Sequence, residues 1–348
     1  MNLSRLGGNT FAGGLLLAFL LLGGPLKMQG QGKTDVALNS KGAEYVVFAR
    51  SDQPASAERG GAAIVNDPAL ILNFSSRYLE LMLKDGTALS DLKLRATDPA
   101  FSRDGKRIAL SSNQNSNRFQ ISVMSLVDRK VAQLRHFQSG DALGPVWSPD
   151  DKQIAFYAFR YSNPSREPEL YVMDADGGNV RKLADHASEP SWSPDSKSIA
   201  FTSAAGGKFD IAVIRIDGSN RKQLTQGTGE NSAPAWSPDG STIAFSSDRQ
   251  GRNAVYLMNP DGTEQQRFVF SKKEEFCFAA WSRGNDVLAF TSLIPNTTQM
   301  IVAGEELPKC QRWAGTYQIY SVGSDGKNLH LLSPKTGGLK PSFGILAP

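Results

Sequence analysis

The feature that most constrains the fold is a tetrad, Trp-Ser-Pro-Asp, that recurs along the chain at nearly constant spacing. Full copies begin at Trp147, Trp192 and Trp236, and looser copies begin at Phe101 and Trp281. Successive aromatic residues of this series are 44 to 46 residues apart. A period that constant indicates a repeat array, in which each repeat is one supersecondary unit.

Each repeat contains three further segments. An apolar triplet such as Ile-Ala-Phe at 154–156 follows the tetrad, and an alternating run such as Leu-Tyr-Val-Met at 170–173 comes next. An Asp-Gly turn, for example at 217–218, then leads into a short segment that ends near Leu224. Such runs, divided by Pro-Asp and Asp-Gly turns, predict strands joined by hairpins. Four strands in about 45 residues form one antiparallel sheet, and sheets repeated around an axis form a β-propeller.

These residues resemble the TolB-like six-bladed β-propeller family, which is built from WD40-like beta propeller (PD40) repeats. The family consensus is close to P-x-W-S-P-D-G-x-x-I-A-F…I-Y-V-M-D-x-D-G…R-x-L, and five consecutive copies here follow it. The resemblance covers about residues 44–346. It implies an all-β fold, a six-bladed β-propeller of four-stranded antiparallel blades.

Partial repeats at the two ends predict how the ring closes. Residues 44–50 match the Ile-Ala-Phe strand and residues 78–86 match the alternating strand with its turn, but no tetrad precedes them. Residues 341–343 match the start of a Trp strand with nothing after it. We therefore expect the C-terminal strand to join the N-terminal blade. The expected blades are 44–96 with 340–346, 97–140, 141–186, 187–229, 230–273 and 274–339.

Residues 1–32 are predicted to be a signal peptide. Arg5 precedes an apolar stretch from Phe11 to Leu22, which is short for a bilayer span and typical of a signal-peptide core. A Gly-x-Gly pattern ending at residue 32 offers a cleavage site, and an earlier glycine or an uncleaved anchor stays open as an alternative. Residues 33–43 then form a short linker. We expect a periplasmic or secreted protein with no stable membrane span once the signal is cleaved.

Export bears on the two cysteines, because disulfides form in oxidising compartments. Cys277 lies four residues before Trp281, and Cys310 lies in an insertion of the same repeat. In a propeller, the crossings between blades and the loops between second and third strands emerge on one face, so we expect Cys277 and Cys310 to pair. The bond would contribute roughly 3–4 kcal/mol in the chain-entropy model. Two free, buried thiols are the alternative.

Three insertions between second and third strands, at 51–77, 157–169 and 292–316, predict the binding face. Long loops on a rigid scaffold are where binding usually occurs. Arg312 and Trp313 lie in the third insertion and are of the types that anchor interfaces. The alternative is that Trp313 folds back to pack its own loop.

Acidic side chains occupy the crossings into the predicted inner strands. They are Asp98, Asp141, Glu189, Glu230, Glu274 and Glu275. Around the mouth of the channel they would form a negative ring suited to a cation, an amine or a basic peptide. The alternative is that they only cap turns before the prolines that follow several of them.

The sequence offers no recognisable catalytic motif. No H-E-x-x-H or G-x-S-x-G pattern occurs, so no catalytic residue and no metal ligand set is predicted. No cofactor is expected, although a cation bound in the channel stays open. The net charge of +4 comes from scattered basic residues, so we expect no nucleic-acid partner. The chain has three histidines, His136, His186 and His330. His136 and His186 are expected to be solvated loop residues, and a metal site near Asp141 and Asp185 is the alternative.

The leading functional prediction is an exported, non-enzymatic scaffold that binds a protein or peptide of the cell envelope through the insertion-bearing face. The resemblance implies envelope work, because the member that gives the family its name acts in the periplasm with a peptidoglycan-associated lipoprotein and other Tol components. That member has an α/β domain before its propeller, so this chain is expected not to be TolB itself. The alternatives are a carbohydrate- or peptide-processing enzyme, with an acidic and metal-assisted site at the channel, and a subunit of a larger envelope complex.

Overall fold

The structure is a computed structural model, and it describes residues 44–51, 77–83, 88–114, 118–134, 140–162, 167–227, 229–299, 313–332 and 338–345. The chain divides into two compact units, Met1–Val36 and Ala37–Pro348, and every described residue belongs to the second. No helix in the described part is long and apolar enough to cross a membrane.

Five four-stranded antiparallel sheets each use four consecutive strands, in chain order from the inside outwards. The first contains β4 (Thr97–Phe101), β5 (Arg107–Ser112), β6 (Gln120–Ser125) and β7 (Val131–Gln133). The second contains β8 (Gly140–Trp147), β9 (Gln153–Arg160), β10 (Pro168–Asp174) and β11 (Arg181–Asp185). The third contains β12 (Ala187–Trp192), β13 (Ser198–Ser203), β14 (Asp210–Arg215) and β15 (Lys222–Gln223). The fourth contains β16 (Asn231–Trp236), β17 (Ile243–Ser247), β18 (Ala254–Met258) and β19 (Gln266–Val269). The fifth contains β20 (Glu275–Trp281), β21 (Val287–Gln299), β22 (Trp313–Gly323) and β23 (His330–Leu331).

A composite sheet of a different construction has the order β24-β1-β2-β3. It contains β1 (Glu44–Ser51), β2 (Arg77–Leu83), β3 (Ala88–Arg95) and β24 (Gly338–Ile345). The prediction of a six-bladed propeller is therefore wrong: five blades carry the repeat through consecutive strands, and the described side chains belong to them. No tetrad precedes β1, so the sequence directly before β1 does not have the pattern of an inner strand. The inner strand of this sheet is β24, which pairs with β1.

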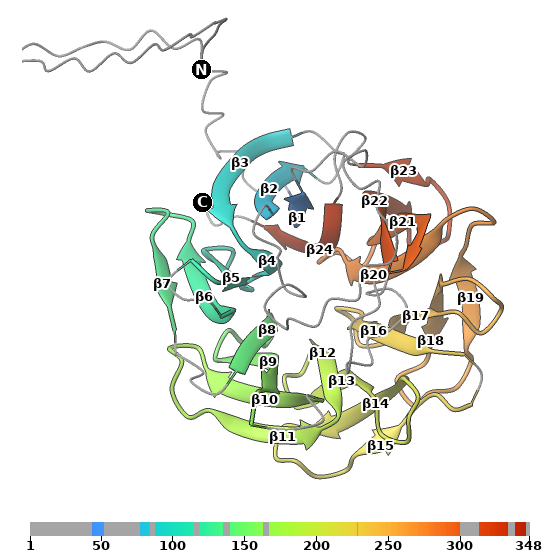
Figure 1. Cartoon of the computed structure of the whole chain (residues 1–348), viewed down its shortest axis with the longest axis horizontal. Coiled ribbons are helices and arrows are strands. Elements are labelled where there is room, and N and C mark those ends of the chain that lie inside the picture. The colour runs from blue at the N-terminus through green and yellow to red at the C-terminus, as the bar shows by residue number, and fades with distance from the viewer. Residues whose placement is uncertain are drawn as a thin grey trace, which may run out of the picture. The chain divides into compact units, whose positions relative to one another are not determined.

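The inner strands follow one another around a central space (Figure 1). Contacts join β4 to β8, β8 to β12, β12 to β16 and β16 to β20. The same kind of contact joins β20 to β24 and β24 to β4, so the circuit closes. The five repeat blades and the composite sheet therefore surround one axis.

The hydrophobic core lies between neighbouring blades. Ile154 and Phe156 of β9 cluster with Ala109 and Ile121 of the preceding blade. The phenylalanines of the later triplets, at 201, 245 and 290, are fully buried. Burying a side chain of this size contributes about 1.5–3 kcal/mol, which explains why the triplet recurs.

The tetrad residues have separate structural tasks. In the second blade the Ser148 hydroxyl donates to Asp150 Oδ1 over 2.6 Å and accepts from the Gln153 amide over 2.9 Å, which closes the β8–β9 turn. The aromatic residue links neighbouring blades in two copies, because the Trp192 indole N–H donates to the Val146 carbonyl and the Trp281 indole N–H donates to the Ala235 carbonyl, each over 3.1 Å. The Trp236 indole N–H instead donates to the Gly240 carbonyl in its own turn.

Candidate functional site: a pocket at the ring centre

A left-handed residue interrupts each inner strand of the five repeat blades. It lies three residues before the aromatic residue of the tetrad and has φ between 51° and 58°. The residues at this bulge position are Asp98, Gly144, Glu189, Ala233 and Phe278. The strand pairing is irregular at the same place in each blade. Four of the five are not glycine, and such a conformation costs on the order of 1–3 kcal/mol each and is concentrated at functional sites.

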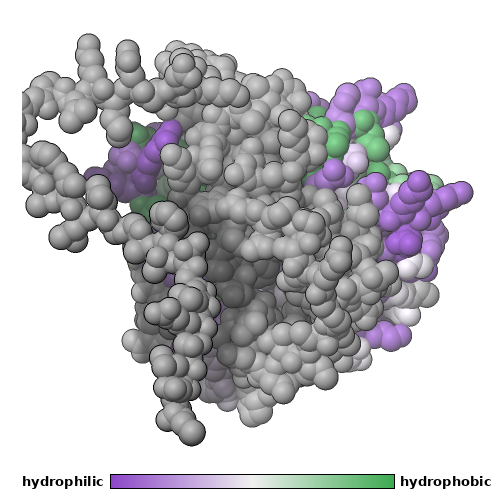
Figure 2. All heavy atoms as spheres, turned by 45° about the horizontal axis from the view of Figure 1, so that its top comes forward, coloured by the Kyte–Doolittle hydropathy of each residue, from purple (hydrophilic) through white to green (hydrophobic). Residues whose placement is uncertain are grey.

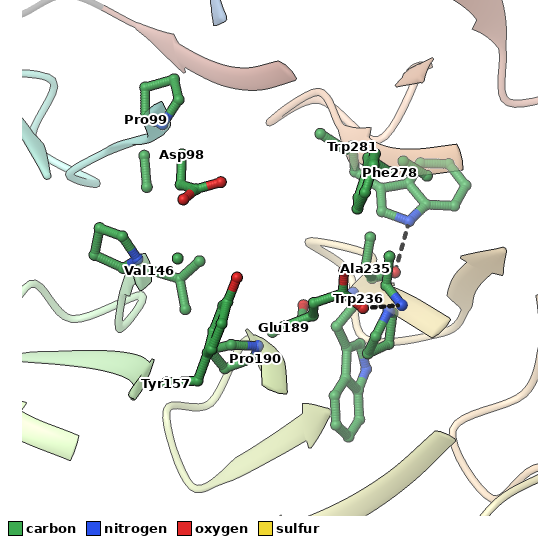
Figure 3. Close-up of a pocket in the computed structure, with 18 of the residues that line it drawn as sticks. Asp98, Pro99, Val146, Tyr157, Glu189, Pro190, Ala235, Trp236, Phe278 and Trp281 are labelled. Carbon is green, nitrogen blue, oxygen red and sulfur yellow. Dashed lines mark hydrogen bonds between the residues drawn. The ribbon is translucent and has the colours of Figure 1, made fainter. Parts of the chain in front are cut away.

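These bulges surround a cavity of about 270 Å³ (Figure 3). Three consecutive residues from each inner strand line it, beginning with the bulge residue: 98–100, 144–146, 189–191, 233–235 and 278–280. Tyr157, Trp236, Pro238 and Trp281 complete the described lining. The cavity therefore runs along the inner strands from the bulges, and on β16 and β20 it reaches the aromatic residue of the tetrad.

One side of the pocket is polar. Asp98 on β4 and Glu189 on β12 are the charged residues of the described lining, and both are more than nine-tenths buried. Glu189 Oε2 accepts hydrogen bonds from the Thr202 hydroxyl over 2.7 Å and the Ala233 amide over 2.9 Å. Its carboxylate is therefore held by a neighbouring strand of its own blade and by the next inner strand.

Tyr157 reaches this side from β9, and Gly144 makes room for it. A Cβ atom on Gly144 would lie 2.5 Å from Tyr157 Cε1, which is closer than two carbon atoms can approach. In the other blades the bulge residue carries its own side chain, whereas here the tyrosine ring occupies that space. Figure 3 shows the Tyr157 hydroxyl directed into the pocket between Asp98 and Glu189.

The opposite side of the pocket is apolar. Phe278 and Trp281 of β20 and Trp236 of β16 line it together with small alanines. The Trp281 indole donates to the Ala235 carbonyl over 3.1 Å, and the Trp236 amide donates to the Ser191 hydroxyl over 2.9 Å. These bonds join neighbouring inner strands, so the wall has little freedom to move.

Two of the predicted site residues lie between blades instead of at the pocket. The Asp141 carboxylate accepts from the Phe119 amide over 2.7 Å and from the Tyr161 hydroxyl. Burial raises the pKa of Asp141 above its ordinary value. Glu275 accepts from the Asn253 amide and from Arg252 Nη1, the latter over 3.1 Å. Both carboxylates attach the start of an inner strand to the preceding blade.

The remaining crossing acids are also outside the described lining of the pocket. Glu230 is half-buried, and its amide donates to Asp248 Oδ1 over 2.7 Å. The Glu274 carboxylate accepts from the Ser292 hydroxyl. The structure therefore brings together Asp98 and Glu189, and it adds Tyr157, Gly144 and Phe278, which sequence reasoning missed.

Several predictions concern the insertions. The third insertion begins and ends as strand, since β21 extends to Gln299, which pairs with Trp313 at the start of β22. Arg312 and Cys310 lie outside the described residues, as does the side chain of Trp313. Cys277 is buried and disulfide-bonded, and its pairing with Cys310 stays a prediction.

Neither metal ligands nor a surface patch gives a stronger site in the described part of the chain. No group of three or more His, Cys, Asp or Glu side chains there could hold a metal ion. Half-exposed His186 has its Nδ1 2.8 Å from Glu167 Oε2. Figure 2 shows mostly hydrophilic described side chains around a smaller hydrophobic group. The exposed large apolar side chains include Val127, Phe270 and Leu329, and nothing in the structure shows what covers them.

Comparisons with known proteins agree with the propeller architecture. Residues 181–312 match the family model described as PD40, TolB beta propeller domain. A putative TolB from Agrobacterium tumefaciens is similar, with a TM-score of 0.61 and 20% identity over 86% of this chain and 91% of that chain. TolB from Acinetobacter baumannii has a TM-score of 0.63 and 20% identity, over 86% of this chain and 66% of that chain. Hydrazine synthase from Kuenenia stuttgartiensis has a TM-score of 0.62 and 13% identity, over 86% of this chain and 46% of that chain. Likeness at these identities shows the fold alone.

Proposed function

We propose that the protein is a non-enzymatic scaffold of the cell envelope that binds a segment of another protein at its ring-centre pocket. The insertions at 51–77, 157–169 and 292–316 would provide the flanking contacts. The observation that carries this proposal is a preformed cavity whose walls are backbone bulges and tryptophan residues that are hydrogen-bonded to the neighbouring inner strands. A site that needs no reordering loses little affinity to conformational entropy.

The size of the cavity favours a side chain over a large ligand. Pockets for drug-sized molecules are about 300–1,000 Å³, whereas this one is about 270 Å³. One or two side chains of a docked segment fill such a volume. The surrounding insertions would then contact the rest of the partner, as loops on a rigid scaffold commonly do.

Two features support a location outside the cytoplasm, in the periplasm or secreted. Residues 11–22 have the apolar character of a signal-peptide core. Cys277 is disulfide-bonded, and structural disulfides persist mainly in oxidising compartments.

The test is cross-linking in the native cell envelope followed by mass spectrometry, with a variant that blocks the pocket. Ala279 lines the cavity on β20 and is half-buried, so Ala279→Phe should fill the space. Ala205→Phe, at an exposed position in the turn after β13, is the matched control. We expect a partner captured by the intact protein and by Ala205→Phe to be lost from folded Ala279→Phe. Equal capture by all three proteins would contradict pocket binding.

A second variant tests the insertion-bearing face. Replacing residues 293–315 by a short turn should weaken capture of the same partner while the pocket stays intact. If the variant with the replaced insertion still captures the partner and only Ala279→Phe loses it, the partner is recognised by the pocket alone.

An enzymatic role is the second candidate, because Asp98, Glu189 and Tyr157 face one cavity. Two carboxylates can divide general acid and base work in glycoside hydrolysis. Turnover of an oligosaccharide or peptide that Asp98→Asn abolishes, or stoichiometric Mn²⁺, Ca²⁺ or Zn²⁺ in the purified protein, would favour it over the scaffold.

A further inference from the structure

We infer that the protein associates reversibly with the surface of an anionic phospholipid bilayer through an outer corner of its fourth repeat blade. This outer corner consists of Arg267, Phe270, Lys272 and Lys273, on β19 and directly after it. Figure 1 places β19 at the outer edge of the ring, away from the central space. The inference therefore goes beyond the proposed function and does not depend on the pocket.

The second blade shows how a cation at this place in the repeat is ordinarily neutralised. Lys182 on β11 pairs with Tyr171 of the neighbouring strand. Its ammonium group lies 2.7 Å from Asp185 Oδ1 and 3.3 Å from Glu169 Oε1. Two carboxylates of the same blade therefore balance the charge of this lysine.

The fourth blade has the cation without these two carboxylates. Arg267 pairs with Tyr256 in the register that the lysine has in the second blade. By this register Phe270 stands at the place of the aspartate and Ala254 at the place of the glutamate. The substitution replaces an ion pair by an arginine beside an exposed aromatic ring, so the positive charge stays unbalanced.

The arginine and the ring are stacked. The guanidinium carbon of Arg267 lies 3.8 Å from the centroid of the Phe270 ring. Among the described residues, the Arg267 side chain has no hydrogen bond and no ion pair. A guanidinium held flat against a ring keeps its N–H groups available, and their planar arrangement matches the oxygens of a phosphate group. Phe270 is itself 52% exposed.

Two lysines extend the positive charge along the crossing to β20. Lys272 and Lys273 are exposed, and neither side chain forms a hydrogen bond or an ion pair within the described part of the chain. The amides of Lys273 and Glu274 donate to Ser271 Oγ over 3.1 Å and 3.2 Å, which orders the turn. The acid of this turn does not balance the lysines, because the Glu274 carboxylate accepts from the Ser292 hydroxyl.

A bilayer surface fits this combination better than a protein segment does. An aromatic side chain that projects from an outer corner can enter the acyl boundary of a bilayer, which needs no preformed cavity. Lysine and arginine side chains beside it keep their charged ends at the headgroup phosphates. One aromatic ring and three cations give a reversible contact, which would add to the binding of a protein partner elsewhere on the ring.

The experiment is flotation of the full chain with two kinds of vesicle. One is phosphatidylcholine alone, and the other is equal parts phosphatidylcholine and phosphatidylglycerol. We expect at least roughly tenfold stronger binding to the anionic vesicles, and this preference should disappear as salt is raised. Binding by the apolar residues 11–22 needs no anionic lipid, so the ratio between the two vesicles reports the charged surface.

Charge variants assign the preference to the outer corner. Phe270→Asp gives Arg267 the carboxylate that the second blade has, and it should reduce the preference roughly tenfold. Lys272→Gln with Lys273→Gln should reduce it roughly fivefold for each lysine. The matched control is Lys197→Gln with Lys208→Gln, which removes two exposed charges of the third blade and should change little. Equal losses in the two double variants would mean that net charge alone drives binding, and the inference would be overturned.

Insertion of the ring is measured separately. Phe270→Trp should show emission that brominated phosphatidylglycerol quenches, and Ala205→Trp, at an exposed turn of the third blade, should not. Absence of quenching in Phe270→Trp would overturn the inference. Binding of the peptide Ac-Glu-Glu-Phe-Glu-Glu-amide that Phe270→Asp abolishes, without any preference for anionic vesicles, would overturn it in favour of an acidic protein segment.

Discussion

At the scale of single residues, Gly144 controls whether Tyr157 can enter the pocket. Gly144→Ala places a Cβ atom 2.5 Å from the tyrosine ring. Gly206 also has a positive φ but nothing within 4 Å of the added atom, so Gly206→Ala is a control for backbone strain. We expect Gly144→Ala to lower the free energy of unfolding by about 1–3 kcal/mol more than Gly206→Ala does, as overpacking usually costs. Denaturant titration measures both, and equal losses would mean that the contact with Tyr157 is unimportant.

The acidic residues show how far the sequence could predict the site. It indicated carboxylates near the channel, and the distance from the tetrad separates them. Asp98 and Glu189 lie three residues before the aromatic residue and line the pocket, whereas Asp141 and Glu275 lie six before it and join blades. This difference in spacing is present in the sequence and separates the pocket acids from the acids that join blades. Tyr157 was not predictable in this way, because it comes from another strand and depends on a side chain that Gly144 lacks.

At the scale of elements, the looser tetrads have a task that the full copies lack. Arg283, in the turn between β20 and β21, occupies the place of the tetrad proline. Its guanidinium donates to the carbonyls of Ser102 and Arg103 in the β4–β5 turn, over 2.6 Å in each case. The two turns belong to the blades on either side of the composite sheet. Arg283 therefore ties those two blades together directly.

Restoring the consensus at this position should thus destabilise the protein. Arg283→Pro fits a turn in which three other copies carry proline, yet it removes two charge-assisted hydrogen bonds. We expect it to lower the free energy of unfolding by about 1–3 kcal/mol. Arg215→Ala, which removes an exposed ion pair with Asp217, should change stability by less than about 1 kcal/mol. Chemical denaturation compares the stabilities of Arg283→Pro and Arg215→Ala. An Arg283→Pro variant as stable as the parent would show that Arg283 does not stabilise the contact between the two blades.

At the scale of the whole molecule, the repeat period predicted a propeller because each tetrad marks the end of one inner strand and the turn that follows it. The period could not describe the composite sheet, whose inner strand comes from the far end of the chain. β24 pairs with β1 from Glu44 opposite Ile345 to Arg50 opposite Gly338, and it contacts β4 and β20.

Deleting residues 340–348 removes most of the β24–β1 ladder, whose hydrogen bonds contribute about 0.5–1.5 kcal/mol each. We expect a loss on the order of 3–5 kcal/mol, seen as one cooperative thermal transition at lower temperature, because every inner strand depends on its two neighbours. Deleting only 346–348 spares the strand and should leave the midpoint unchanged. If both truncated proteins unfold at the same temperature as the full chain, the stability of the ring does not depend on β24. The hydrogen bonds from Arg283 to Ser102 and Arg103 would then have to hold the two flanking blades together without this strand.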